Sequence, residues 1–179
     1  PVCISAMGRK INPFMDMVAF YRILQYIKKF KPDIVHTHTA KAGVLGRLAA
    51  TIAGVPVKAH TFHGTVFHGY FGRRKTAFFM GLERMMSRFT DAIVAISPSQ
   101  KNDVVEKYRI AEAGKCHMIK LGFDMKRLSE EPAGKGASFR RRFNFRADDI
   151  LIGTVGRLVP IKNHKMFVDA AGYALDYAR

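Results

Sequence analysis

Short apolar runs alternate along this sequence with longer segments in which apolar residues recur at helical spacing. The runs of strand length are residues 2–6, 33–38, 57–62, 92–97, 116–121 and 150–155, and the helical segments are residues 14–30, 40–53, 74–89, 99–108 and 163 onward. Most of the runs are apolar on both faces, which is typical of strands in a parallel sheet covered by helices. The pattern therefore predicts an α/β fold assembled from βαβ units.

Local signals at the ends of the helical segments support this assignment. Pro13 suits the first turn of the first helix, and Lys31-Pro32 stops it. Thr39 is the predicted N-cap of the second helix, and Gly54 is its stop signal. The apolar positions of the first helix form one face, which we predict to be buried: Phe14, Met17, Val18, Tyr21, Leu24 and Ile27.

The composition changes between residues 123 and 149, where Ser, Glu, Pro and Gly interrupt the alternation. We predict an N-terminal domain at residues 1–128, and a linker with the start of a second domain at residues 129–179. A single βα unit cannot bury its own core, because domains below about 40 residues rarely stand alone. We therefore expect that the second domain is truncated, and that a first strand before Pro1 is missing as well.

The chain is strongly basic, with 30 Lys and Arg residues against 14 Asp and Glu residues and a formal net charge of +16. Its 48% hydrophobic content excludes a disordered chain, and its apolar runs are shorter than the roughly 20 residues of a membrane-spanning helix. Two isolated cysteines favour a reducing, cytoplasmic location. Basicity leaves nucleic-acid binding open as an alternative, but we expect no nucleic-acid partner because no DNA- or RNA-binding module is recognisable.

The most informative segment for function is residues 34–82, which contain no Asp or Glu and five of the seven histidines. His36 and His38 end one predicted strand, and His60 and His63 end the next. Ligands of open parallel sheets bind beyond the carboxyl ends of the strands, and a helix N-terminus there favours negative charge. The segment predicts an anion site, for a phosphate or a sugar phosphate.

Two other interpretations of these histidines stay open. The spacing of His36 and His38 puts both rings on one strand face, as in some zinc sites, but the acid-free segment supplies no carboxylate to complete such a site, and we expect no metal. His36 and His60 could instead be buried strand residues hydrogen-bonded to the backbone. His63 differs from both, because it follows the strand and precedes Gly64, where a side chain can reach a ligand.

A second group of residues follows the last predicted strand. Arg157 and Lys162 lie five residues apart in a loop before a helix. A guanidinium, an ammonium and the free amides of a helix start together can hold a diphosphate. The alternative is that both are ordinary solvated loop cations.

Several of these motifs, in this order and spacing, resemble the family 4 glycosyltransferases of the GT-B fold. They are Asp33-Ile34-Val35-His36-Thr37-His38, Thr61-Phe62-His63-Gly64, Ile96-Ser97-Pro98-Ser99, Leu121-Gly122-Phe123-Asp124, and Val155-Gly156-Arg157-Leu158 with Lys162-Asn163. The resemblance implies two Rossmann-like domains that face a cleft. It also implies transfer of a sugar from a nucleotide-diphosphate sugar, UDP-linked, to a glycan or lipid-linked acceptor, with retention of configuration and without a metal or other cofactor.

The resemblance assigns roles to single residues. Arg157 and Lys162 would hold the donor diphosphate, and His63 would be the catalytic residue beside the donor sugar. His38, Lys41 and Gly64 would line the acceptor side of the cleft, and Gly122 would lie near the hinge between the domains. A Gly-rich loop at the start of the family pattern and two glutamates near its end are absent from this sequence. We therefore expect the 179 residues to be inactive alone. A non-catalytic module that binds a sugar phosphate is the alternative.

Residues 66–75, with Phe78, Phe79, Met80, Met85 and Met86, combine aromatic, apolar and basic side chains. Such a surface can lie on an anionic membrane. This favours a peripheral protein at the inner face of the cytoplasmic membrane that takes part in polysaccharide assembly. The alternative is that Phe78, Phe79, Leu82 and Met86 are the core face of a helix.

Overall fold

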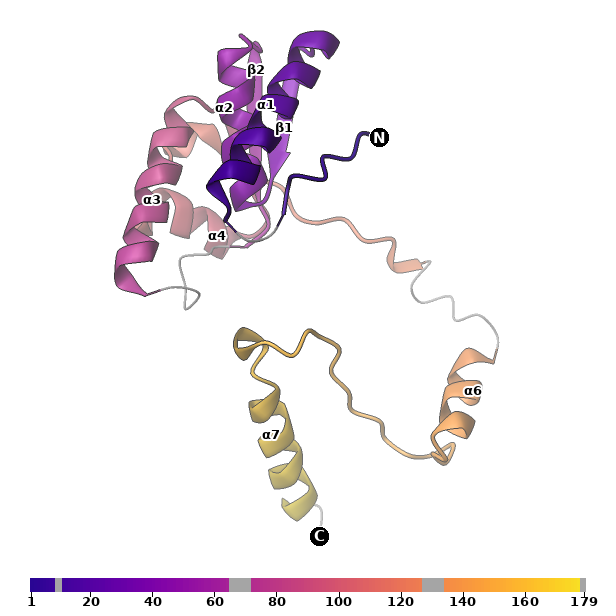
Figure 1. Ribbon diagram of the computed structural model, residues 1–179. Coiled ribbons are helices and arrows are strands. Elements are labelled where there is room, and N and C mark those ends of the chain that lie inside the picture. The colour runs from indigo at the N-terminus through magenta and orange to yellow at the C-terminus, as the bar shows by residue number, and fades with distance from the viewer. Residues whose placement is uncertain (9–10, 65–71, 127–133, 178–179) are drawn as a thin grey trace. The chain divides into compact units, whose positions relative to one another are not determined.

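The computed structural model describes residues 1–8, 11–64, 72–126 and 134–177, which form two compact units, Pro1–Leu121 and Gly122–Arg179 (Figure 1). The first unit contains a parallel sheet of four strands in the order β1-β2-β3-β4. Its elements are α1 (Pro13–Phe30), β1 (Ile34–His38), α2 (Ala40–Ile52), β2 (Val57–Phe62), α3 (Arg73–Arg88), β3 (Ala92–Ala95), α4 (Pro98–Asn102), a π-helix (Asp103–Lys107), a 3-10 turn (Ala113–Lys115) and β4 (Cys116–Met118). The predicted α/β fold is confirmed.

Each strand of the sheet pairs in parallel with the next strand along the chain. The register aligns Thr37 with His60 and His38 with Thr61, and β3 continues with Ile93 beside His60. Helical crossovers between consecutive parallel strands are right-handed, which places the connecting helices on one face of a sheet of this order. The arrangement is Rossmann-like.

Both the first and the second helix begin as the sequence predicts, but in different ways. Asn12 caps α1 by accepting a hydrogen bond from the Met15 amide at 3.2 Å, and Pro13 occupies the first turn. Thr39 occupies the N-cap position of α2, yet its side chain makes no capping hydrogen bond. Its φ of 65° lies in a region that β-branched residues rarely adopt, so the backbone is strained between β1 and α2.

The hydrophobic core lies between the sheet and the segment that follows β3. It consists of Phe62, Ile93, Ala95, Val104, Ile110 and Cys116. The helix predicted for residues 99–108 is divided here into α4 and a π-helix, which carries Val104 into this core. Burial of the Cys116 thiol in this core raises its pKa.

Two glycines let α2 pack directly against the sheet. A Cβ atom on Gly43 would lie 2.4 Å from Cε1 of His60, and one on Gly46 would lie 2.8 Å from Cγ2 of Thr37. Helix α2 also contacts α1 and α3, so it lies between them (Figure 1). The small residues of α2 thus place its first turns over Thr37 and His60.

Gly43→Ala is expected to lower the free energy of unfolding by about 1–3 kcal/mol, because the new methyl group overpacks the buried His60 ring. Gly81→Ala is the matched control. Gly81 lies inside α3 with nothing within 4 Å of the added atom, so alanine there is expected to add about 0.5–1 kcal/mol. Urea unfolding of both variants measures the two changes, and equal effects would contradict this packing.

Three local predictions are wrong. Residues 2–6 and 150–155 form no strand, since no neighbouring strand is described that could complete their hydrogen bonds. On the predicted core face of α1, Phe14 is 73% exposed, and Met17 and Tyr21 are exposed as well. The side chain of α1 that is completely buried is Ala19, since α1 packs mainly on α2.

The second unit contains α6 (Lys135–Arg142), a 3-10 turn (Pro160–Lys162) and α7 (His164–Tyr177). Three partly exposed phenylalanines, Phe139, Phe143 and Phe145, form a small aromatic cluster at α6, with centroid separations of 4.9–6.4 Å. None of the helices in the described parts of the chain is long and apolar enough to cross a membrane.

Candidate functional site

A pair of histidines marks the carboxyl ends of β1 and β2. Nδ1 of His38 lies 2.9 Å from Nε2 of His63, and the His36 ring lies 4.4 Å from the His38 ring, centroid to centroid. The His38 and His63 rings share one hydrogen bond, so one of these two nitrogens donates and the other accepts. Desolvation and the neighbouring rings of His36 and His63 lower the pKa of His38. Both His38 and His63 are exposed, so the pair is open to ligands.

The interpretation of His36 as a buried strand residue that is hydrogen-bonded to the backbone is wrong. The residue is exposed, and its Nε2 lies 2.8 Å from Oγ1 of Thr61 on the neighbouring strand. Side chains alternate along a strand, so His36 and His38 lie on the sheet face opposite to Thr37, which packs under α2. His36 and His38 thus share one face, as predicted.

His60 is fully buried, but its partner is a side chain rather than the backbone. Its Nδ1 lies 2.9 Å from Oγ1 of Thr37, whose hydroxyl donates to the Ala59 carbonyl. The Thr37 oxygen therefore accepts from Nδ1–H of His60, and Nε2 carries the lone pair, with no hydrogen-bond partner among the described residues. Burial, with the nearby Arg47 charge as the second cause, lowers the pKa of His60 to about 3.

This pKa makes stability depend on pH. The unfolded chain protonates His60 below pH 6.5, whereas the folded chain does so only near pH 3, so its contribution is lost as the pH falls through this window. The free energy of unfolding of the wild type, relative to His60→Gln, should decrease by about 1.4 kcal/mol per pH unit between about pH 6 and 4. Urea titrations across this range measure the difference, and a constant difference would contradict a neutral buried His60.

Lys41, predicted to lie on the acceptor side, connects three segments. Its ammonium forms an ion pair with Asp16 of α1 and donates to the Gly8 carbonyl at 2.9 Å. Asp16 in turn accepts from the Asn12 amide at 3.1 Å. Lys41 thus ties the N-terminal segment and the start of α1 to the first turn of α2. Gly64 follows His63 at the surface, with open space where a Cβ would stand.

Beneath the site, a buried ion pair joins α2 to α3. Nη2 of Arg47 lies 2.7 Å from Oε2 of Glu83, and Nε of Arg47 donates to the Gly43 carbonyl at 3.0 Å. The side chains of Arg47 and Glu83 are 0% and 5% exposed. Sequence analysis missed this pair. The available signal was the position of Glu83, which is the first acidic residue after the acid-free segment 34–82.

The second unit carries the two predicted diphosphate ligands. The loop from Arg157 folds back, so that a Cβ on Gly156 would lie 3.8 Å from Cγ of Lys162. Nε2 of His164 donates to the Arg157 carbonyl at 2.9 Å, and Asn163 caps α7 by accepting from the Met166 amide at 3.4 Å. Lys162 therefore lies near the residue preceding Arg157. His164, whose hydrogen bond joins the start of α7 to the backbone at Arg157, was not singled out from the sequence.

The predicted site residues are divided between the two units. His38, Lys41, His63 and Gly64 belong to the first unit, and Arg157 and Lys162 belong to the second. In the described residues no group of three or more His, Cys, Asp or Glu side chains could hold a metal ion.

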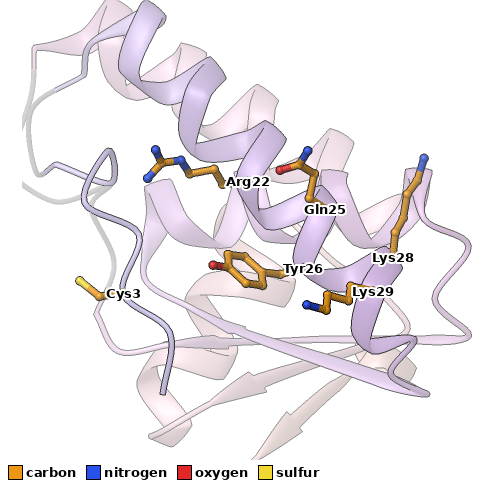
Figure 2. A pocket seen from close by; sticks show the side chains of 6 residues that line it. All are labelled: Cys3, Arg22, Gln25, Tyr26, Lys28 and Lys29. Atoms are coloured by element: carbon orange, nitrogen blue, oxygen red, sulfur yellow. The ribbon is translucent and has the colours of Figure 1, made fainter.

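A hollow of about 510 Å³ lies elsewhere, along α1 and the N-terminal segment (Figure 2). Its lining residues are Cys3, Arg22, Gln25, Tyr26, Lys28 and Lys29. None of the predicted site residues contributes to it, and most of its lining side chains are exposed cations or amides of α1. This hollow is separate from the histidine pair.

The aromatic and basic segment predicted to face a membrane falls partly outside the described residues, which omit 65–71. In the described remainder, Phe78 is 67% exposed and Met85 is 48% exposed, whereas Met86 is buried. Phe79 and Leu82 are partly buried. Helix α3 therefore has one apolar set in the core and a second one at the surface.

Comparison with known proteins identifies the family. The sequence profile of Glycosyltransferase Family 4 matches residues 6–127. The chain is 30% identical over 174 residues to a UDP-Gal:alpha-D-GlcNAc-diphosphoundecaprenol alpha-1,3-galactosyltransferase of Escherichia coli, covering 97% of this chain and 44% of that protein. It is 28% identical over 170 residues to the capsular polysaccharide biosynthesis glycosyltransferase CapM of Staphylococcus aureus, covering 89% of this chain and 42% of that protein.

The fold has a counterpart among solved structures. A glycosyltransferase from Rickettsia africae ESF-5 superposes with a TM-score of 0.54 at 21% identity, over 79% of this chain and 36% of that chain. The chain thus spans less than half the length of these relatives. The profile match covers most of the chain, and together with these relatives it shows that the chain belongs to glycosyltransferase family 4.

Proposed function

We propose that the protein to which this chain belongs transfers a sugar from a UDP-sugar to a glycan or lipid-linked acceptor, with retention of configuration, in the assembly of a cell-surface polysaccharide. The observation that carries the proposal is the His38–His63 pair at the carboxyl ends of β1 and β2. Both side chains are exposed, and residues 34–82 around them contain no Asp or Glu, which suits contact with a sugar and a diphosphate.

The substrate classes rest on two relatives. The name of the Escherichia coli relative specifies UDP-Gal as the donor and a diphosphoundecaprenol-linked sugar as the acceptor. CapM is named for capsular polysaccharide biosynthesis. The first name supports a nucleotide-sugar donor and a lipid-linked acceptor for this chain, and the second supports a role in the assembly of a polysaccharide.

In the proposed reaction, the bond between C1 of the sugar and the β-phosphate oxygen breaks, and its electron pair leaves with the nucleoside diphosphate. The acceptor hydroxyl forms the new bond to C1 on the same face, and its proton passes to the departing phosphate. Arg157 and Lys162 stabilise the negative charge that develops on the leaving diphosphate. His63 contacts the donor sugar beside C1, and His38 orients His63 through their shared hydrogen bond.

A donor panel tests the proposal. The whole protein is incubated with UDP-, GDP- and ADP-sugars, with and without EDTA, and release of the nucleoside diphosphate is measured. We expect turnover of a UDP-sugar that EDTA leaves unchanged. Binding of a sugar phosphate without any turnover would favour a non-catalytic binding module, and neither binding nor turnover would contradict the proposal.

We also propose that the outer face of α3 lies on the anionic inner surface of the cytoplasmic membrane. Its exposed apolar side chains, Phe78 and Met85, share the helix with five exposed cations, and Glu83, its one acid, is buried against Arg47. The cations are Arg73, Arg74, Lys75, Arg84 and Arg88. Such a face combines apolar insertion with attraction to anionic lipids.

Arg74→Gln with Arg88→Gln should weaken binding to phosphatidylglycerol vesicles about 25-fold, since each cation near the surface contributes about 1 kcal/mol. The matched control, Lys28→Gln with Lys29→Gln, removes two exposed cations from α1 and should change binding less than about twofold. Co-sedimentation measures both. Equal binding to neutral phosphatidylcholine vesicles would contradict the proposal.

A further inference from the structure

An apolar pocket of about 330 Å³ lies among the N-terminal parts of α1 and α2 and the middle of α3. Its walls come from Val44 and Leu45 of α2, Phe79 and Leu82 of α3, and Ile11 just before α1. Ligand pockets commonly measure about 300–1,000 Å³ and are mostly apolar, so its size and lining suit the hydrocarbon part of a ligand. Helix α2, which lies between α1 and α3 (Figure 1), contributes four of its lining residues: Ala40, Lys41, Val44 and Leu45.

The acidic groups at this pocket are neutralised. Glu83 lines it, but its carboxylate binds the buried Arg47 guanidinium. Asp16 also lines it, and its carboxylate pairs with Lys41. The pocket therefore offers no free negative charge from these two residues to an entering ligand.

Exposed cations begin α3, the helix that supplies one wall of the pocket. Positions 75, 78, 79 and 82 share one side of a helix, so Lys75 stands one turn beyond the Phe79 and Leu82 wall. Arg73 and Arg74 precede it and are exposed. An apolar pocket beside a group of cations is complementary to an amphiphile whose hydrocarbon chain ends in phosphates.

The pocket also adjoins the candidate site. His38 ends β1, and Ala40 and Lys41, which line the pocket, form the first turn of α2 immediately after it. The pocket and the histidine pair therefore lie at the same edge of the sheet but on opposite faces, so a ligand that passes around this edge can place a sugar near His38 and His63 and a hydrocarbon chain among the apolar residues of the pocket.

We propose that this pocket binds the isoprenoid chain of a lipid-diphosphate acceptor, with the diphosphate held by Lys75 and its neighbouring cations. The inference rests on the proposed function, of which it specifies the acceptor class. The name of the Escherichia coli relative specifies a diphosphate between sugar and lipid for its acceptor, and such a ligand needs all three features: a polar site for the sugar, cations for the diphosphate and an apolar pocket for the lipid. The nucleotide sugar is polar throughout and does not match an apolar wall.

Calorimetric titration of the chain with farnesyl diphosphate, inorganic diphosphate and farnesol tests the pocket. Farnesyl diphosphate should bind at least about tenfold more tightly than either of the other two, because only it engages both the cations and the apolar wall. Leu45→Trp fills the pocket and should weaken this binding about tenfold or more. Lys75→Gln should weaken farnesyl diphosphate binding and leave farnesol binding unchanged.

Leu48→Trp is the matched control, with the same substitution on the same helix at an exposed position outside the lining, and should leave binding within about twofold. The chain has no tryptophan, so fluorescence of each variant reports whether the new indole is buried or exposed in the folded protein. Equal binding by L45W and L48W would overturn the inference, as would inorganic diphosphate binding as tightly as farnesyl diphosphate. If short-chain phosphatidylglycerol competes as strongly as farnesyl diphosphate itself, the inference is also overturned, because the surface then binds lipids in general.

Failure of this inference is distinguishable from failure of the proposed function. In the whole protein, L45W should raise KM for an isoprenyl-diphosphate-linked acceptor and leave hydrolysis of the UDP-sugar unchanged. If the wild type transfers the sugar and L45W does not change KM for the acceptor, the pocket assignment is overturned but the proposed transferase activity stands. The opposite result is also possible: L45W weakens farnesyl diphosphate binding, but the protein neither hydrolyses nor transfers any nucleotide sugar. This result would overturn the proposed transferase activity and leave the pocket assignment standing.

Discussion

Glu83→Gln is expected to lower the free energy of unfolding of the first unit by about 3 kcal/mol or more. The substitution keeps the shape of the side chain and removes its charge, so the completely buried Arg47 guanidinium is left without a counter-ion. The desolvation of Arg47 is then uncompensated, whereas its hydrogen bond to the Gly43 carbonyl persists. Urea unfolding followed by circular dichroism measures the loss.

Two further variants show whether the buried charge is the cause. Lys107→Gln removes the ion pair between the exposed Lys107 and the partly buried Asp103, 3.8 Å apart in the same unit, and should cost less than about 1 kcal/mol. Arg47→Met with Glu83→Leu replaces both charges by apolar groups and should recover most of the stability lost in Glu83→Gln. A loss in Glu83→Gln no larger than that in Lys107→Gln would contradict the role assigned to this pair.

Arg157→Ala and Lys162→Ala are each expected to lower kcat for sugar transfer by about 10²–10³-fold in the whole protein. Both cations are assigned to the leaving diphosphate, whose charge grows as the bond to C1 breaks, so each variant should lose more in kcat than in donor affinity. Steady-state kinetics with the UDP-sugar as the varied substrate separate the two effects.

The control for this pair is Lys165→Ala, which removes an exposed cation of α7 that pairs with Asp169 at 2.6 Å. It should leave kcat within about twofold, because it lies outside the loop formed by Arg157 and Lys162. Unchanged kcat in both loop variants would mean that these residues are solvated cations, the alternative left open by the sequence.

The sequence predicted the elements whose signals are local. The predicted strand at residues 57–62 matches β2, and the second predicted helix matches α2 to within one residue. Gly54, the stop signal between the two elements, marks the end of the helix. Residues 2–6 and 150–155 have the composition of strands but no strand to pair with in the described structure. Strand formation depends on such a partner, which composition alone cannot reveal.

The candidate site was predictable only in part. The positions of His38 and His63 at two strand ends follow from the order of the elements. The register aligns His38 with Thr61, two residues before His63, but the hydrogen bond between the two rings depends on side-chain orientations that the sequence does not specify. The burial of His60 depends on how closely α2 packs against the sheet at Gly43, and this distance is a tertiary feature that the local sequence does not show. Arg47 and Glu83 lie 36 residues apart in sequence, and no local pattern links them.

The anomeric configuration of the transferred sugar tests the central claim most directly. The whole protein is incubated with the UDP-sugar that the panel identifies, labelled with ¹³C at C1, and with an isoprenyl-diphosphate-linked acceptor. The carbon–proton coupling at C1 of the product is then measured by NMR. The account predicts a new glycosidic bond with the same configuration as the donor. A product of inverted configuration, or release of the nucleoside diphosphate without any sugar joined to an acceptor, would contradict it.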